Sequence, residues 1–537
     1  MPEPIPVTFS PGNVTVWVEA GTTVLDAARR AGVLIDAPCA GRGICGGCGV
    51  RLLDGTLDPA DEVERQGLRR APKGVRLACR ARASRAVSVR PVVPASVRST
   101  ASGSLTAEGS DARCVAAVDL GTTTVAAVLI DAVSRVDLGR SLVANRQRAW
   151  GADVIARIAH ARDGAAEDLR VAAEVSVREA LVAACAGGGH CLGAIERLVI
   201  AGNTAMSSLL IGADVTPLAA HPFAAPYADF AELPAASALR AELAPGVETV
   251  VLPPLSGFVG GDALAGLISS GLGSAGQRGL LLDMGTNAEI VLATGDEFVV
   301  TSAAAGPAFE ASGIASGGSA SEGAIERVSM TDDGGLTVEV IGGGTARWLC
   351  GSGLVSLIAT LTRLGHIDAS GRMLREGPMH DRFAPVDGVE TFVVVESDEP
   401  DVLGVVLTQN DVRSFQLAKG AVRAAIEMLV ARVQLASSPL ADDVVVAGSF
   451  GGALLPEDLI ALGVLPIGFD DRVRVAGNAS LTGAAMLAVD AAVADSMSSL
   501  TGRVRHVDLA AEAEFSARYL ESLSLEPYEL GTLRDRA

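Results

Sequence analysis

Alternating hydrophobic and polar residues predict a small mixed domain at the start of the chain. Residues 5–19 have the pattern of two such strands joined by a Pro-Gly-Asn turn, and residues 23–31 that of a short helix capped by Thr22 or Thr23. This order of elements favours an α+β domain of the β-grasp type over residues 1–93. The later parts of that domain are a glycine-rich loop at 39–49 and strand-like runs at 50–55, 76–83 and 86–93.

The pattern changes at residue 94. Residues 94–113 are rich in Ser, Ala, Thr and Gly and poor in large apolar side chains, which is typical of a flexible linker. Apolar strands and amphipathic helices then alternate to about residue 490, as in an α/β domain. Residues 491–537 have the pattern of an acidic, helical C-terminal tail.

An internal repeat divides the α/β region. Residues 114–131 and 279–295 both consist of an apolar strand, an Asp-x-Gly-Thr turn and a second apolar strand. Residues 197–212 and 443–459 both consist of a strand, a glycine turn and a helix, in the same order within each half. The economical explanation is a duplicated α/β domain whose two lobes enclose a cleft. The predicted lobes are 114–278 and 279–490.

Composition narrows the classes of function. The chain has 537 residues, 49% hydrophobic and 20% charged, with a net charge of −20 that argues against DNA or RNA as a partner. A nucleotide remains possible, because backbone N–H groups alone can bind a phosphate. No secretory signal and no apolar stretch of bilayer length is evident, so we expect a cytoplasmic protein that does not cross a membrane.

Four of the eight cysteines lie near the N-terminus with the spacing C-x5-C-x2-C-x30-C. Three thiolates from one loop and one from a distant segment suit a [2Fe–2S] cluster, and the interleaved glycines let backbone N–H groups approach its sulfurs. A zinc site favours two C-x2-C pairs, and a redox dithiol leaves two of the four cysteines unused. We therefore predict Cys39, Cys45, Cys48 and Cys79 as cluster ligands. The dispersed Cys114, Cys185, Cys191 and Cys350 are interpreted as small core residues.

The two Asp-x-Gly-Thr hairpins predict a nucleotide site. Each turn presents backbone N–H groups and hydroxyls, which together suit an anion, and its aspartate suits Mg²⁺ held through water. The strand-to-helix glycine turn at 444–452 suits close approach by a nucleoside, and no Walker A sequence competes for the role. The predicted catalytic residues are Asp119 and Asp283. The predicted ATP-binding residues are Gly121, Thr122, Thr123, Thr124, Gly285, Thr286, Asn287, Gly448, Ser449 and Gly451.

These features together resemble a known family. The hairpin pair with the later glycine turn resembles the actin, sugar-kinase and heat-shock-chaperone ATPase superfamily, and the five-residue gap in the cysteine loop resembles adrenodoxin-like ferredoxins. Joined in one chain, they resemble the reductive activators of corrinoid proteins. The segments that carry this resemblance include 151–158, 201–206, 253–263, 304–310, 350–354, 407–421 and 477–485.

The resemblance implies a function. A corrinoid methyl carrier works through Co(I), and its oxidised Co(II) form needs an electron at very low potential. The family implies ATP-dependent delivery of that electron from a [2Fe–2S] cluster, with Mg²⁺, an upstream electron donor, a corrinoid methyltransferase protein as partner, and a homodimer. Two other hypotheses are a redox-sensing, chaperone-like interaction protein and a small-molecule kinase with a ferredoxin appendage.

The chain departs from the family at two places. Fuller members carry a small extra domain where this chain has only the 94–113 linker, and they tend to have a bulkier pair, often with His, at Ser207 and Ser208. Among single residues, Glu289 and Glu310 are candidates for orienting the attacking water. Lys419 is expected more on a solvated helix face than on a phosphate. The six histidines show no metal-ligand spacing.

Overall fold

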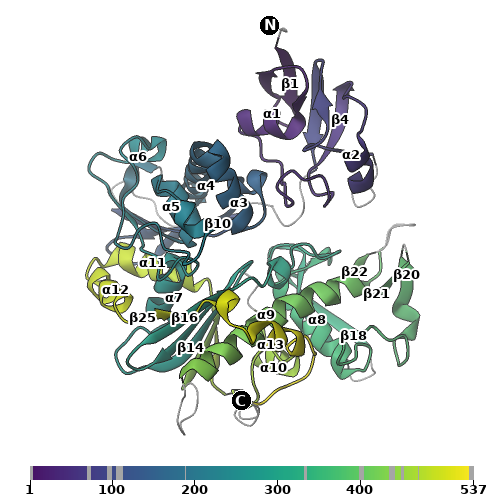
Figure 1. Ribbon diagram of the computed structural model, residues 1–537, viewed down its shortest axis with the longest axis vertical. Coiled ribbons are helices and arrows are strands. Elements are labelled where there is room, and N and C mark those ends of the chain that lie inside the picture. Colours follow the sequence, from purple (N-terminus) through teal and green to yellow (C-terminus); the bar gives the residue numbers. More distant parts are fainter. Residues whose placement is uncertain are drawn as a thin grey trace.

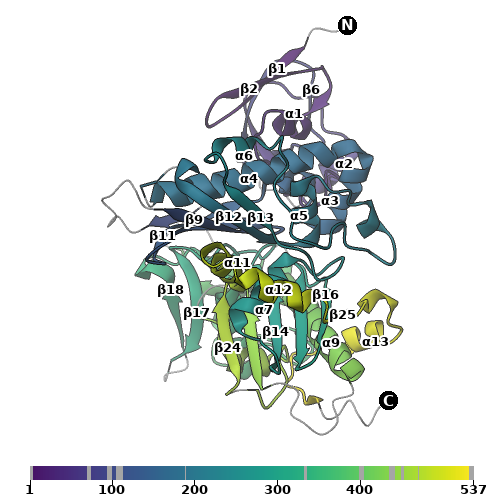
Figure 2. The same ribbon diagram turned by 90° about the vertical axis from the view of Figure 1, so that its left-hand side faces the viewer.

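The computed structural model describes residues 4–68, 74–92, 100–103, 113–187, 189–190, 192–331, 335–386, 388–397, 404–433, 442–448, 453–469 and 471–530. The N-terminal part lies above the helices of a first α/β lobe, and a second lobe lies beneath that lobe (Figure 1, Figure 2). The structure therefore contains the β-grasp part and both lobes that the hydrophobic pattern predicts.

The N-terminal part is a five-stranded sheet in the order β2-β1-β7-β4-β5, with the short pair β3-β6 beside it. Helix α1 (Val24–Arg30) packs on this sheet, and the Thr23 hydroxyl caps it by accepting the N–H of Asp26 at 3.1 Å. Inward-facing alternate residues such as Val7 and Phe9 form its core. The strands are β1 (Ile5–Phe9), β2 (Val14–Val18), β3 (Thr22–Thr23), β4 (Gly49–Gly55), β5 (Arg76–Leu77), β6 (Arg82–Ala83) and β7 (Val87–Pro91), and α2 spans Glu62–Gly67.

The segment 76–83, expected to help close the N-terminal domain, consists of two short strands separated by a turn. The carbonyl of Leu77 accepts the N–H groups of Arg80 and Ala81 at 2.9 and 2.7 Å, which closes the chain between β5 and β6. Cys79 lies in this turn and not on a strand. The turn directs the chain back past the glycine-rich loop.

The two lobes share one strand order. The first sheet runs β13-β12-β9-β10-β11-β8 and the second β24-β23-β14-β15-β16-β25, so five consecutive strands of each correspond. The predicted duplication is confirmed by this match. The strands of the first sheet are β8 (Thr100–Gly103), β9 (Cys114–Leu120), β10 (Thr124–Asp131), β11 (Asp137–Ala144), β12 (Ile195–Gly202) and β13 (Glu248–Val251). Those of the second are β14 (Arg278–Met284), β15 (Ala288–Thr294), β16 (Phe298–Ala303), β23 (Asp443–Ala447), β24 (Val473–Gly477) and β25 (Val504–His506).

Helices cover both sheets. Helices α7 and α11 lie between the lobes, in a core that joins β9 of the first sheet to β14 of the second. The first lobe carries α3 (Val154–His160), α4 (Ala166–Gly187), α5 (Thr204–Ile211), α6 (Ala238–Glu242) and the 3-10 helix η3 (Arg146–Trp150), followed by α7 (Gly261–Ser270). The later helices are α8 (Gly351–Arg363), α9 (Gln409–Val433), α10 (Pro456–Ala461), α11 (Ala479–Val489), α12 (Val493–Thr501) and α13 (Phe515–Glu521).

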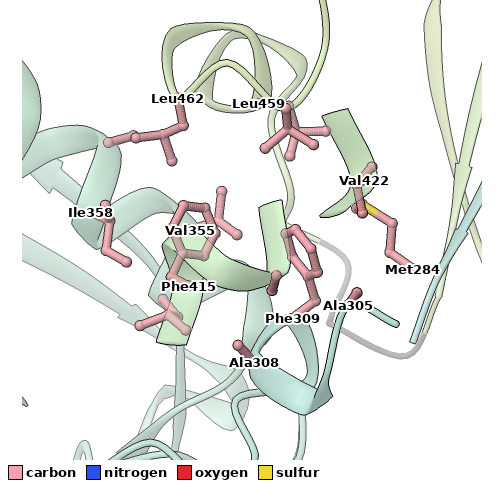
Figure 3. Packing of buried hydrophobic residues seen from close by; sticks show 14 of the residues in the cluster. Met284, Ala305, Ala308, Phe309, Val355, Ile358, Phe415, Val422, Leu459 and Leu462 are labelled. Carbon is pink, nitrogen blue, oxygen red and sulfur yellow. The ribbon is translucent and has the colours of Figure 1, made fainter. Parts of the chain in front are cut away.

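The second lobe has the larger core and two added sheets. Phe309 and Phe415 meet edge to face at 5.6 Å between ring centroids, surrounded by residues of α8, α9 and α10 (Figure 3). The same core includes Met284 and Ala288, the residues on either side of the β14–β15 turn, so this packing supports the hairpin. The added sheets are β18-β17-β19, with β17 (Ala324–Met330), β18 (Leu336–Val340) and β19 (Trp348–Leu349), and β20-β21-β22, with β20 (Phe383–Val386), β21 (Val389–Val395) and β22 (Val405–Thr408).

Two segments carry strands that the sequence pattern did not indicate. Within the expected linker, Thr100–Gly103 pair with β11, and the rest of 93–112 lies outside the described residues. Within the expected helical tail, Val504–His506 pair with β16. Both runs are short edge strands, and such strands leave little alternation to detect.

Candidate functional site

The two Asp-x-Gly-Thr hairpins face each other across the boundary between the lobes. Each sits where a central strand turns back, β9 into β10 and β14 into β15. The hydroxyls of Thr123 and Thr286 form a hydrogen bond at 2.9 Å from one hairpin to the other. The cleft at this point brings together ten predicted residues: Asp119, Gly121, Thr122, Thr123, Thr124, Asp283, Gly285, Thr286, Asn287 and Gly448. The predicted Ser449 and Gly451 lie outside the described residues.

Asp119 is held by the helix that separates the lobes. Asn478 donates its side-chain amide to one carboxylate oxygen at 2.8 Å, and the Ser480 hydroxyl donates to the other at 2.9 Å. Burial raises the pKa of Asp119, and these two hydrogen bonds oppose that rise. The carboxylate is thereby fixed at the floor of the cleft.

Four more carboxyls lie near Asp119 in the cleft: Glu289 is buried, and Asp262, Asp283 and Glu310 are half-buried. Burial, together with its acidic neighbours, raises the pKa of Asp262 to about 7 and that of Asp283 to about 8. Burial also raises the pKa values of Glu289 and Glu310, and Glu310 accepts the Thr286 hydroxyl at 3.0 Å. Such crowding of carboxyls is relieved when a divalent cation enters.

The residues present fit Mg²⁺ held largely through water. Within the described part of the chain, no three His, Cys, Asp or Glu side chains converge closely enough to coordinate one ion directly. Mg²⁺ keeps several of its waters and commonly binds through one or two carboxylates and substrate phosphates. The cleft offers carboxylates and hydroxyls in that arrangement.

Raising the pH from about 6 to about 8 is expected to lower the thermal stability of the magnesium-free protein. The folded pKa values of Asp262 and Asp283 lie well above the unfolded value of about 3.9. The folded state therefore binds more protons, and stability declines as the pH rises from about 4 to about 8. Asp283→Asn should flatten this profile in unfolding experiments with a chelator, whereas the exposed Asp137→Asn should not. Parallel profiles for wild type and Asp283→Asn contradict this interpretation.

Sequence reasoning missed three polar residues that line the same cleft, Asn203, Asp262 and Asn478, and each stands at the beginning of a helix. Asn203 and Asn478 directly follow a glycine that ends a strand, whereas Asp262 follows the glycines that end a loop. A polar residue at a strand-to-helix glycine turn marks the carboxyl end of a strand in an open α/β sheet, and this signal identifies Asn203 and Asn478.

Lys419 corrects an expectation. Its side chain is fully buried on α9, where its ammonium group donates to the carbonyls of Gly463 and Ser524. Burial lowers the pKa of Lys419 to about 7. It is therefore neither on a solvated face nor at a phosphate, and it attaches the segment after α13 to the second lobe.

The four predicted cysteine ligands lie together at the end of the N-terminal sheet that faces the first lobe. Cys48 and Cys79 have sulfurs 3.3 Å apart, and Cys39 hydrogen-bonds to Cys45. This hydrogen bond lowers the pKa of Cys39 to about 4, whereas the bond to Cys48, together with burial, raises the pKa of Cys79. Two close thiol pairs fit a centre with two metals better than a single tetrahedral ion.

The loop around these sulfurs is shaped by glycines. A side chain at Gly47 would come within 3.0 Å of the Pro38 ring, and Gly46 has a φ of +78°. The N–H of Gly47 points to the sulfur of Cys45 at 3.4 Å. The loop can thus wrap a compact inorganic centre with its backbone amides. The dispersed Cys114, Cys185 and Cys350 are buried as predicted, and Cys191 lies outside the described residues.

The loop is also fixed to the first lobe. Asp36 forms a buried two-pronged salt bridge with Arg148 of η3, with one distance of 3.1 Å. The N–H of Ala152 donates to the carbonyl of Pro38 at 3.4 Å. The cysteine loop and the nucleotide cleft therefore belong to one connected structure.

No described helix is long and apolar enough to span a membrane.

Comparisons with known proteins match the whole architecture. Family models match a 2Fe-2S iron-sulfur cluster binding domain at 7–84, the RACo middle region at 114–275 and the C-terminal ASKHA domain of RACo at 277–534. The chain is 31% identical over 414 residues to the corrinoid activation enzyme RamQ of Eubacterium limosum, covering 75% of this chain and 69% of that protein.

Two further proteins are similar to this chain over most of its length. The [Co(II) methylated amine-specific corrinoid protein] reductase of Methanosarcina barkeri is 26% identical over 371 residues, covering 62% of this chain and 63% of that protein. A solved structure described as a reductive activator for corrinoid, iron-sulfur protein superposes with a TM-score of 0.73 at 25% identity. That match covers 98% of this chain and 99% of the other.

Proposed function

The chain belongs to the RACo family of corrinoid activation enzymes, and from this we propose that it reduces the inactive Co(II) form of a corrinoid protein to Co(I) in an ATP-dependent reaction. The observation that carries the proposal is the joining of two sites in one chain. Paired thiols suited to a [2Fe–2S] cluster are fixed to the lobe that presents one of two facing nucleotide hairpins.

In this proposal Cys39, Cys45, Cys48 and Cys79 hold the cluster. When bound, a [2Fe–2S] cluster supplies one electron at a time at low potential. The chain's own residues set its surroundings: the glycine loop directs N–H groups to the sulfurs, and the first lobe covers one side. Ile44, within the loop and 47% exposed, marks the side open to a partner.

In this proposal, nucleotide binding in the cleft controls the affinity of the protein for its partner. We propose that the N–H groups and hydroxyls of the 121–124 and 285–287 turns bind the phosphates, and that Asp119 and Asp283 hold Mg²⁺ through water. The glycine turn with Gly448, Ser449 and Gly451 would take the nucleoside. Because the hairpins belong to different lobes and touch at Thr123 and Thr286, a phosphate between them changes the lobe separation. Such a change gives nucleotide states with different affinities for a partner.

Several finer parts of the proposal follow from the family resemblance. An upstream one-electron donor recharges the cluster after each transfer, the partner is a corrinoid methyltransferase component, and the protein acts as a cytoplasmic homodimer. Light scattering of the purified chain tests the dimer. A mass of one chain, with both cofactors bound, contradicts it.

The proposal is tested with anaerobically reconstituted protein. We expect a coloured protein with two irons per chain and a slow ATPase that a Co(II) corrinoid protein stimulates. Affinity changes without electron delivery would instead favour a redox sensor. Transfer of the γ-phosphate to a small acceptor would favour a kinase. An ATPase that no corrinoid protein stimulates, with the cluster intact, contradicts the proposed function.

A further inference from the structure

The 3-10 helix η3 and the turn after it lie between the cysteine loop and the first nucleotide hairpin. On the cysteine side, the N–H of Ala37 donates to the carbonyl of Arg148 at 3.2 Å, beside the buried Asp36–Arg148 salt bridge. Arg29 of α1 donates to the carbonyl of Ala149 at 3.1 Å. The loop that carries Cys39 is thereby tied to η3 at several points.

The same segment is tied to the nucleotide hairpin. Asn145, which caps η3, donates its side-chain amide to the carbonyl of Gly121 at 2.8 Å and its backbone N–H to that of Thr123 at 3.0 Å. Arg157 donates to the carbonyl of Thr122 at 2.6 Å and to that of Gly151 at 3.0 Å. Hydrogen bonds from Asn145 and Arg157 therefore fix the carbonyls of the predicted phosphate-binding turn.

These contacts form a short continuous path. Pro38, next to Cys39 in sequence, accepts the N–H of Ala152, and the adjacent Gly151 accepts from Arg157, which also donates to Thr122. Pro38 in turn packs against Gly47, between two of the predicted ligands. No more than one arginine side chain and one turn separate the cysteine loop from the hairpin.

The path is buried and contains two guanidinium groups, one of them paired with Asp36. Arg148 and Arg157 are 5% and 0% exposed. The hydrogen bonds of Arg157 go to neutral acceptors, the two carbonyls and the sulfur of Met206, so its charge is not cancelled by a contacting carboxylate. The charge of Arg148 also lowers the pKa of Glu310 in the cleft against the effect of burial. Arg148 therefore acts on the cleft while it pairs with Asp36 beside the cysteine loop, and Arg157 joins the hairpin at Thr122 to the turn at Gly151.

We propose that Arg148 and Arg157 are positioning residues that couple the nucleotide to the electron, so that each weakens the binding of the other. The inference rests on the proposed function, because it takes both ligands from it. A magnesium-bound triphosphate carries net negative charge, and reduction of the centre adds one negative charge. The two negative charges repel each other across a region of low dielectric, and a guanidinium group drawn towards one of them moves away from the other. The nucleotide thus makes the centre a stronger reductant.

By thermodynamic linkage, the change in nucleotide affinity on reduction and the change in midpoint potential on nucleotide binding correspond to the same free energy. If reduction weakens nucleotide binding by a given factor, the nucleotide lowers the midpoint potential by the equivalent amount. We expect a factor of about five, at the low end of ordinary coupling between sites. For a one-electron couple at about 59 mV per tenfold, this corresponds to about 40 mV.

The test measures the affinity of the holoprotein for a non-hydrolysable ATP analogue with Mg²⁺, by anaerobic calorimetry, in the oxidised and dithionite-reduced states. The wild type should bind about five times more weakly when reduced. Arg157→Met and the double variant Arg148→Met/Asp36→Asn should each bring the ratio below about two. Equal affinities in both states of the wild type, or tighter binding when reduced, overturn the proposal.

A matched control removes an arginine elsewhere on the same lobe. Arg113 pairs with Glu196 on the surface at the other end of β9, and Arg113→Gln should keep the fivefold ratio. If Arg157→Met does not fold, the double variant Arg148→Met/Asp36→Asn decides, because it removes the charge of Arg148 without leaving Asp36 as an unpaired buried carboxylate. A ratio that survives in the double variant overturns the role of this path.

Two experimental outcomes distinguish an error in the proposed coupling from an error in the proposed function. A redox-dependent affinity without any Co(II) reduction removes the corrinoid function and leaves the coupling. Co(II) reduction with equal affinities in both redox states removes the coupling and leaves the function.

Discussion

Cys45→Ser is expected to abolish electron delivery to a Co(II) corrinoid protein, lowering the rate by more than about 100-fold. Changes outside the ligands of a metal site already cost 10–100-fold, so the loss of a ligand costs more. Cys45 is hydrogen-bonded to Cys39 and to the N–H of Gly47, and a hydroxyl cannot replace its thiolate. The measurement combines iron content, visible spectrum and the rate of Co(I) formation.

Nucleotide binding serves as the internal control for this variant, because the cleft contains none of the four cysteines. Cys185→Ala, in a buried cysteine of α4 outside the N-terminal domain, should keep the iron and the rate. Full iron content together with undiminished electron delivery in Cys45→Ser would remove this cysteine from the site.

Asp119→Asn is expected to lower ATP turnover by about 10²–10³-fold, the usual cost of removing one preorganised electrostatic group. Asp119 is fixed by Asn478 and Ser480, so the uncharged amide remains in place and only the attraction for Mg²⁺ is lost. The required Mg²⁺ concentration should rise together with the loss of rate. Phosphate release at a series of Mg²⁺ concentrations measures both.

Asp137→Asn is the matched control for this change. Asp137 begins β11, where it forms an exposed ion pair with Arg140, and its loss should change turnover less than twofold. Equal turnover in Asp119→Asn and wild type would show that the cation is held elsewhere.

The sequence alone predicts the parts of this structure that short motifs encode. The cap at Thr23 and the two Asp-x-Gly-Thr hairpins each depend on residues a few positions apart, and each appears where the pattern indicates. The duplicated strand order also follows from repeated local patterns. The conformational preferences of the backbone and the alternation of hydrophobic and polar residues act over such short distances.

Long-range packing accounts for what the sequence did not reveal. The Asp36–Arg148 salt bridge joins residues 112 positions apart, and no local pattern indicates it. Lys419 carries no local signal of its burial, because the carbonyls that receive it come from two distant segments. Asn478 reaches Asp119 only because α11 packs between the lobes.

The central claim is that one electron passes from the cysteine-bound centre to Co(II) only when ATP occupies the cleft. The most direct measurement mixes stoichiometrically pre-reduced protein, free of other reductant, with a Co(II) corrinoid protein and follows the cobalt spectrum with and without MgATP. The account predicts up to one Co(I) per reduced centre with ATP and almost none without it. Equal Co(I) in both samples, or none in either while the centre stays reduced, would contradict it.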